Sequence, residues 1–171
     1  DALTQGTDIG PVVSQAQLEQ DLSYVEIARA EGATLAAGGA RVACHTGSGH
    51  DGFFMAPALI TDTTAGMRIN REEVFGPVAS VILVKDYEEA LATANDTEFG
   101  LSAGIATTSL KYATHFKRHS QAGMVMVNLP TAGVDYHVPF GGRKASSYGP
   151  REQGKYAQEF FTTVKTAYTL A

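Results

Sequence analysis

The stretch Arg71-Glu72-Glu73-Val74-Phe75-Gly76-Pro77-Val78 places two carboxylates and an aromatic ring directly before the most apolar run of the chain, residues 79–84. Pro77 fixes its own φ at about −65° and biases Gly76 away from helix, so the polar residues should stay at the mouth of the following strand. In α/β proteins, ligands can be met at such a strand end. Taken alone, these residues also suit a solvated turn, the usual place of charged side chains.

The composition is that of one globular domain of ordinary size, 171 residues long. With 44% hydrophobic and 18% charged residues, the chain shows no sign of disorder, and its apolar runs are too short to span a membrane. A net charge of −5 argues against a nucleic-acid surface. We recognise no secretory signal, and the single cysteine suits a reducing, cytoplasmic compartment. Because the chain begins at Asp1 without Met, we expect a fragment of a longer polypeptide, although tag processing gives the same appearance.

Capping residues and apolar spacing predict the helices. Ser14 followed by Gln17 has the capping-box pattern, and it predicts an amphipathic helix over residues 15–31 that ends at Gly32. The other expected helices are one capped by Asp86 that runs to about Asn95, one capped by Thr108 or Ser109, and one at 151–160. Residues 67–73 are expected to form a short irregular or helical passage.

Strands are predicted by apolar runs between turn signals. The run 53–60 contains Pro57, which demotes it to an edge strand or an extended connection. Residues 162–169 are β-prone but half polar, so they should form an edge strand or pair with another subunit. The remaining strands are expected at 33–37, 79–84 (a buried strand), 101–107 and 124–127. The alternation of strands and helices over 79–127 predicts an α/β fold with right-handed crossovers and a parallel sheet.

Nucleophilic chemistry has weak candidates in the chain. Cys44 with His45 and His50 suggests a thiol-imidazole pair, because a nearby imidazole lowers a thiol pKa, but the three lie in a turn-rich loop that fixes no geometry. They also supply too few ligands for a zinc site, so no metal is expected. Ser146 and Ser147 lack the His/Asp pattern of a serine hydrolase.

Several separate motifs span the chain: Ile9-Gly10-Pro11-Val12-Val13-Ser14, Glu72-Glu73-Val74-Phe75-Gly76-Pro77-Val78, Phe99-Gly100-Leu101-Ser102-Ala103, Val127-Asn128, Pro139-Phe140-Gly141-Gly142-Arg143-Lys144, Arg151-Glu152-Gln153-Gly154 and Thr163-Val164-Lys165-Thr166. In this order they resemble the C-terminal part of the catalytic domain of the aldehyde dehydrogenase superfamily. Asn128-Leu129-Pro130 and Asp135-Tyr136-His137 are similar to a branch that includes α-ketoglutaric semialdehyde dehydrogenases.

The resemblance implies an oxidoreductase that converts an aldehyde to a carboxylate with NAD or NADP, and the similar branch makes a semialdehyde one candidate substrate. In the family a Cys thiolate attacks the aldehyde, a backbone amide and an Asn stabilise the oxyanion, and a Glu activates water for hydrolysis. The family's nucleophile, base and cofactor domain all precede the segment that Ile9-Gly10-Pro11 matches. We therefore expect residues 1–160 to be part of a catalytic domain with no catalytic residue, and the isolated chain to be inactive.

The resemblance also assigns binding roles by position. Glu73 matches a residue that accepts hydrogen bonds from the nicotinamide ribose, and Phe75 matches the aromatic beside the nicotinamide. Phe140 matches an aromatic near the nucleophile, and Val134 matches a variable substrate-pocket position. Residues 161–171 resemble a strand used in homo-oligomerisation. The family's Ser-Gly-x-Gly-Arg-Glu is replaced here by Ser-Ser-Tyr-Gly-Pro-Arg-Glu at 146–152, so the local turn should differ.

Three hypotheses follow. The first is a segment of an NAD(P)-dependent aldehyde dehydrogenase, with a small aldehyde as substrate and neither nucleic acid nor membrane as partner. The second is a stand-alone, non-catalytic assembly module derived from the same fold. The third, a hydrolase that uses Cys44, is remote. If a first domain is missing, an apolar face should be exposed and the segment should associate.

Overall fold

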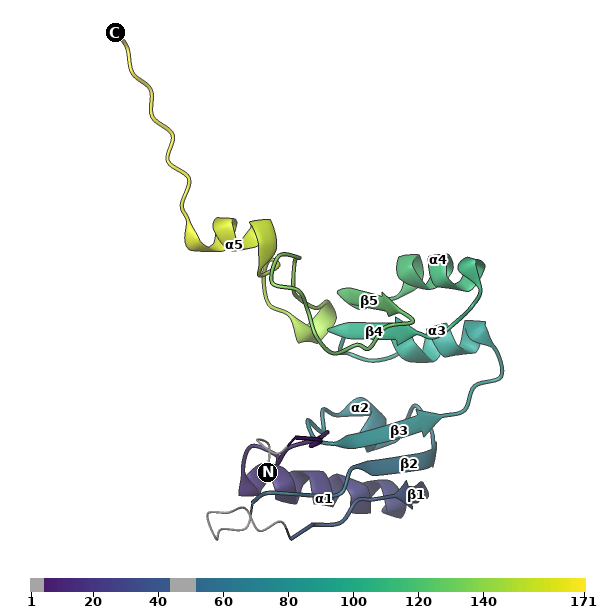
Figure 1. Cartoon of the computed structure of the whole chain (residues 1–171). Coiled ribbons are helices and arrows are strands. Elements are labelled where there is room, and N and C mark those ends of the chain that lie inside the picture. Colours follow the sequence, from purple (N-terminus) through teal and green to yellow (C-terminus); the bar gives the residue numbers. More distant parts are fainter. Residues whose placement is uncertain (1–4, 44–51) are drawn as a thin grey trace. The chain divides into compact units, whose positions relative to one another are not determined.

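The computed structural model describes residues 5–43 and 52–171. The chain divides into a first unit, Asp1–Val84, and a second unit, Lys85–Ala171. Figure 1 labels the elements of the first unit, which are α1 (Gln15–Ala30), β1 (Thr34–Ala37), β2 (Ala58–Thr63), α2 (Arg68–Arg71) and β3 (Val78–Ile82). The second unit contains α3 (Tyr87–Asn95), β4 (Ser102–Ile105), α4 (Leu110–His119), β5 (Met124–Val127), the 3₁₀ turn Lys144–Ser146 and α5 (Gly154–Phe161).

Helix α1 carries the core of the first unit. Its N-cap is confirmed, because the Ser14 hydroxyl accepts a hydrogen bond from the Gln17 backbone N–H at 3.2 Å. Apolar side chains on its inner face pack against the sheet, and α1 contacts both β1 and β2. The buried cluster is Leu18, Val25, Ala28, Ala33, Met55, Ala58, Ile60 and Ile69.

The sheet of the first unit has the order β1-β2-β3, with β1 antiparallel and β3 parallel to β2. The expectation of an extended connection holds for residues 53–57, but an edge position is wrong for the strand that follows, since β2 is central. Pro57 lies just before the strand and removes no ladder donor, while the next N–H, that of Ala58, donates to the carbonyl of Pro77 at 2.9 Å. The strand begins after Pro57 rather than running through it.

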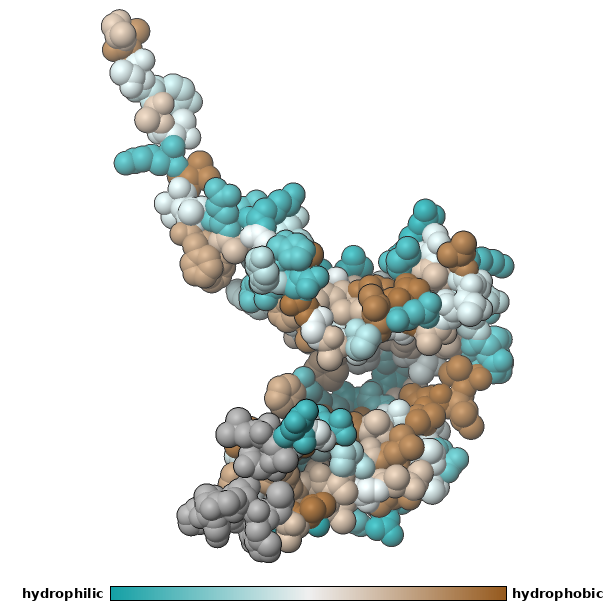
Figure 2. Space-filling view, viewed as in Figure 1, coloured by the Kyte–Doolittle hydropathy of each residue, from teal (hydrophilic) through white to brown (hydrophobic). Residues whose placement is uncertain are grey.

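Strand β3 is only half covered. Residues 79–84 were expected to be buried, but β3 is an edge strand of its sheet, and Ala79, Ser80 and Val81 are exposed. Leu83, just after β3, is 82% exposed. Figure 2 shows apolar side chains gathered at this end of the first unit. An apolar edge of this kind needs a further covering element.

The second unit holds a separate parallel pair, β4 and β5, in register from Ser102 opposite Met124 to Ile105 opposite Val127. Parallel pairing is confirmed within each unit: β3 pairs with β2 in the first unit, and β4 pairs with β5 in the second. The expected caps are confirmed, because Asp86 accepts from the Glu89 N–H and Ser109, not Thr108, caps α4.

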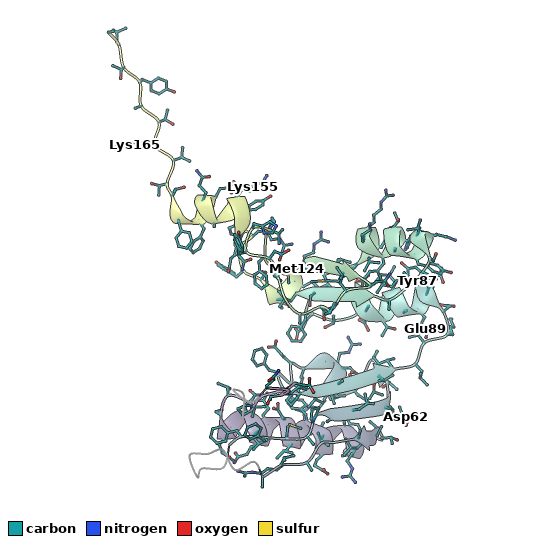
Figure 3. The ribbon with its side chains drawn as sticks, in the orientation of Figure 1. Asp62, Tyr87, Glu89, Met124, Lys155 and Lys165 are labelled. Atoms are coloured by element: carbon teal, nitrogen blue, oxygen red, sulfur yellow. The ribbon has the colours of Figure 1, made fainter. Side chains whose placement is uncertain are left out.

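The C-terminal residues do not form the expected strand. Residues 162–171 follow α5 without helix or strand structure, and Lys165 marks them in Figure 3. Val164, Tyr168 and Leu170 are 98%, 95% and 99% exposed. A β-prone segment becomes a strand only when another backbone supplies hydrogen bonds. The described part of the chain supplies none for these residues.

The central position of β2 gives a stability prediction. Ile60 is fully buried, whereas its neighbour Leu59 points to the other face and is 40% exposed. Ile60→Ala should lower the unfolding free energy of the chain by about 2–5 kcal/mol, because it leaves a cavity. Leu59→Ala is the matched control and should cost about 1 kcal/mol or less. Urea unfolding followed by circular dichroism measures both, and equal losses would contradict this arrangement of the sheet.

Candidate functional site

The loop at 72–77 lies at the mouth of β3, as its sequence predicts. Helix α2 ends at Arg71, and Pro77 directly precedes β3. Phe75 has a φ of 60°, a left-handed conformation that is uncommon for an aromatic residue, and its side chain is 74% exposed. The loop thus presents an aromatic ring outward that nothing in its own packing explains.

The two carboxylates of the loop are in different states. Glu72 accepts a bidentate pair of hydrogen bonds from Arg68, both at 2.9 Å, and a further one from the Tyr24 hydroxyl at 2.5 Å. The hydrogen bonds from Arg68 and then Tyr24 lower the pKa of Glu72 to about 2. Glu73 is exposed and makes no hydrogen bond or ion pair within the described residues. Of the pair, Glu73 is therefore the carboxylate that is free to accept from a ligand.

Helix α1 is joined to the loop at 72–77 by hydrogen bonds from two side-chain amides. Gln17 Nε2 and Gln20 Nε2 both donate to the carbonyl oxygen of Val74, at 2.9 and 3.0 Å. Gln17 Nε2 also donates to the carboxylate of Asp21 at 2.7 Å. The capping-box pattern at Ser14 suggested that Gln17 reaches back to the helix start, whereas its amide donates to the loop.

Sequence reasoning missed Asp21 altogether. The residue is fully buried on α1, and burial raises the pKa of its carboxyl against the opposing effect of the Gln17 hydrogen bond. The sequence pattern that could have revealed Asp21 is a charged residue between Leu18 and Val25, two residues that face the core. A charge on the apolar face of a predicted helix needs a specific partner.

Two of the sequence motifs meet in the first unit. The segment from Ile9 to Val13 and the segment from Phe75 to Pro77, with Gln17, line a pocket of about 290 Å³. Its walls are mostly apolar side chains and backbone. The pocket lies beside the exposed ring of Phe75 and the loop that carries Glu73.

The other two predicted site residues lie in the second unit. Val134 lines a pocket of about 220 Å³ with residues of β5, Val138 and Pro139. Phe140 is half-buried, and its backbone exchanges two hydrogen bonds of 2.8 Å with Glu152. The predicted residues thus divide between the units, with Glu73 and Phe75 in the first and Val134 and Phe140 in the second.

The glycine loop after Phe140 is a tightly bonded structural turn. Gly141 and Gly142 are buried, and the Gly142 carbonyl accepts from Arg151 Nη1 at 2.7 Å. The Ser147 hydroxyl, at the position where the family pattern has Gly, accepts from the Gly142 N–H at 2.9 Å. Ser146 accepts from the Gly100 N–H in the same way. Both serine hydroxyls are therefore engaged with backbone.

The remaining candidates find no support in the described residues. Cys44, His45 and His50 lie outside them. Within residues 5–43 and 52–171, no cluster of three or more His, Cys, Asp or Glu side chains could hold a metal ion. In the same ranges, no helix has the length and apolar character needed to cross a membrane.

Comparison with known proteins identifies the family. The model of the aldehyde dehydrogenase family matches residues 1–167, so the chain belongs to this family. An α-ketoglutarate semialdehyde dehydrogenase of Haloferax volcanii is 47% identical over 95% of this chain, and an α-ketoglutaric semialdehyde dehydrogenase of Bacillus subtilis is 42% identical over 98%. The chain spans about a third, 34%, of the length of each.

Solved structures agree with this assignment. An NAD-dependent aldehyde dehydrogenase from Sinorhizobium meliloti superposes with a TM-score of 0.86 at 39% identity, covering 96% of this chain and 31% of that one. The NAD⁺ complex of an aldehyde dehydrogenase from Bacillus cereus gives a TM-score of 0.85, also at 39% identity, covering 95% and 31%. The chain therefore has the fold of part of an aldehyde dehydrogenase.

The raised pKa of Asp21 predicts how stability depends on pH. Well below the ordinary carboxyl pKa of 3.8, the group is protonated in both the folded and the unfolded chain. As the pH rises, the unfolded chain loses this proton first, so wild-type stability falls until the native pKa is passed. Asp21→Asn removes this loss and keeps an oxygen for Gln17. Urea unfolding at pH 4 to 8 should show the variant gaining stability over wild type as pH rises, and a constant difference would contradict the burial effect.

Proposed function

We propose that this chain is the C-terminal part of the catalytic domain of an NAD- or NADP-dependent aldehyde dehydrogenase. Its parent protein would oxidise an aldehyde to a carboxylate, and a semialdehyde is the favoured substrate class because the relatives from Haloferax volcanii and Bacillus subtilis carry that name. Since the chain spans only 34% of those relatives, the nucleophile, the base and the cofactor domain would lie in the rest of the parent. The single cysteine favours a cytoplasmic location.

The observation that carries the cofactor role is the contrast between Glu72 and Glu73. Arg68 and Tyr24 occupy Glu72, whereas Glu73 keeps its acceptor positions open to solvent. Ribose hydroxyls would donate to Glu73, and a hydrogen bond to a charged acceptor contributes about 1.5–3 kcal/mol. The exposed ring of Phe75 beside it would pack against the nicotinamide. When bound, the dinucleotide supplies the hydride acceptor of the oxidation.

The second unit would supply part of the aldehyde site. Val134 lines an open pocket with Met124, Met126 and Val138, and apolar side chains of this kind would pack against the carbon chain of an aldehyde. Phe140, which is fixed by its paired backbone to Glu152, would add an aromatic wall. Both roles rest on the resemblance of these positions to the family pattern.

The C-terminal residues support a role in assembly. The segment 162–171 is exposed, β-prone and without a strand partner among the described residues. Pairing with a second subunit would satisfy its backbone, so we infer a homo-oligomer. The same observation is compatible with a stand-alone assembly module. The encoding reading frame separates the two, since a frame that opens near Asp1 would exclude the enzyme segment.

The division of labour between the two carboxylates can be tested in the protein from the complete reading frame. Glu73→Gln should raise the Kd of the dinucleotide about tenfold to a hundredfold, because one or two charge-assisted hydrogen bonds weaken. Glu72→Gln is the matched control, and it should raise the Kd about threefold or less because Glu72 bonds only to protein. Isothermal titration measures both. A larger effect from Glu72→Gln would refute the assignment.

The isolated chain is predicted to lack dehydrogenase activity. Purified 171-residue protein of confirmed mass should produce no NADH or NADPH above the rate of a blank when mixed with an aldehyde and either cofactor. The physical reason is that no nucleophile-activating arrangement exists among its described residues. Measurable turnover that follows the protein through purification would overturn this prediction.

A further inference from the structure

Asp21 has no role in the site as described above, although burying a carboxyl group is costly. Its residue is 0% exposed. One oxygen, Oδ1, accepts from Gln17, and the other, Oδ2, is buried without a hydrogen-bond partner among the described residues. A buried carboxyl with one unsatisfied oxygen lowers stability, so an apolar residue would serve the core of α1 better. A role in function, rather than in stability, would account for the presence of Asp21 at this buried position.

The first contact of Asp21 leads to the loop through Gln17. A single nitrogen, Gln17 Nε2, donates to Asp21 Oδ1 at 2.7 Å and to the Val74 carbonyl at 2.9 Å. An amide nitrogen carries two protons, and these two acceptors use both. The carboxyl of Asp21 therefore orients the side-chain amide of Gln17 toward Val74. Without the Asp21 carboxyl, the Gln17 amide could rotate away, and the Val74 carbonyl would then keep only the 3.0 Å hydrogen bond from Gln20.

The second contact is direct. A Cβ on Gly76 would lie 2.2 Å from the carboxyl carbon of Asp21 and 2.3 Å from both carboxyl oxygens. The backbone of Gly76 thus rests on the Asp21 side chain. Gly76 does not have a positive φ, so the need for glycine at this position comes from the carboxyl group and not from backbone strain.

These two contacts enclose Phe75. Val74 on one side is held through Gln17, and Gly76 on the other side rests on Asp21. Phe75 itself has a φ of 60° and a side chain that is 74% exposed, so its own packing gives little support to a left-handed conformation that L-residues rarely adopt. Restraint on both neighbours keeps the ring and the adjacent Glu73 in one orientation.

We propose that Asp21 is a positioning residue for dinucleotide binding: it fixes Val74 through Gln17 and supports Gly76, and so holds Glu73 and Phe75 in their binding geometry. This inference rests on the proposed function of the loop. Asp21 touches no ligand, and its effect passes through the shape of residues 74–76. The stability that is lost by burying the Asp21 carboxyl is then offset by a binding loop that is already in its binding conformation before the ligand arrives.

The test is a double-mutant cycle in the protein from the complete reading frame. The variants are Asp21→Ala, Gly76→Ala and the double variant, with the dinucleotide Kd, the two KM values and the melting temperature as measurements. Asp21→Asn preserves shape and an acceptor for Gln17. Glu19→Ala is the matched control, because Glu19 is an exposed carboxylate of the same helix whose one hydrogen bond among the described residues comes from Gln15.

The proposal predicts a specific pattern. Asp21→Ala should raise the dinucleotide Kd and KM about fivefold, leave the KM of the aldehyde unchanged, and be largely rescued in Asp21→Asn. Gly76→Ala should raise the Kd by more, and removal of the carboxyl in the double variant should restore part of that loss. If Gly76→Ala does not fold, recovery of folded protein in the double variant shows the same coupling. Glu19→Ala should match wild type.

Three results would overturn it, and they differ in what they leave standing. If Glu73→Gln weakens dinucleotide binding while Asp21→Ala changes only the melting temperature, Asp21 is merely structural and the proposed function stands. Additive effects of Asp21→Ala and Gly76→Ala would likewise exclude the contact as the cause. If Glu73→Gln leaves the Kd unchanged, the loop is not the cofactor site, and the positioning role fails with it.

Discussion

The first unit depends on one junction, where the carbonyl of Val74 accepts two side-chain amides from α1. This junction joins the helix that forms the core to the loop that leads into β3. Because the Ala58 N–H donates to the Pro77 carbonyl, the same loop is also tied to the central strand. The loop, which lies between α2 and β3, is thereby fixed at both ends. An exposed aromatic ring in a left-handed conformation becomes possible only in such a frame.

The helices could be predicted from sequence because their determinants are local. Ser14, Asp86 and Ser109 each accept from a backbone N–H three residues later, as their side chains and positions indicate. Strand environment is not local. Pro57 suggested an edge, but the strand starts one residue later and takes the central position. Residues 79–84 suggested burial, but the elements of the first unit leave Ala79, Ser80 and Val81 exposed.

The site shows the same division. Family resemblance pointed to Glu73 and Phe75. The structure adds a reason to distinguish Glu73 from Glu72, because Glu72 is hydrogen-bonded to Tyr24 of α1 and Arg68 of α2. No spacing rule in the sequence connects positions 24 and 72. Asp21 and Gln17 were hidden for a similar reason, because their partners Val74 and Gly76 are far away in the chain. Long-range contacts decide which of two identical side chains is available.

We infer that the loop at the mouth of β3 is this chain's share of a dinucleotide site. A crystal structure of the protein from the complete reading frame, with bound NAD⁺ or NADP⁺, tests it most directly. The account predicts ribose hydroxyls within hydrogen-bond distance of the Glu73 carboxylate, with Glu72 still bonded to Arg68 and Tyr24. Ribose bonded to Glu72, or a dinucleotide bound away from this loop, would contradict it.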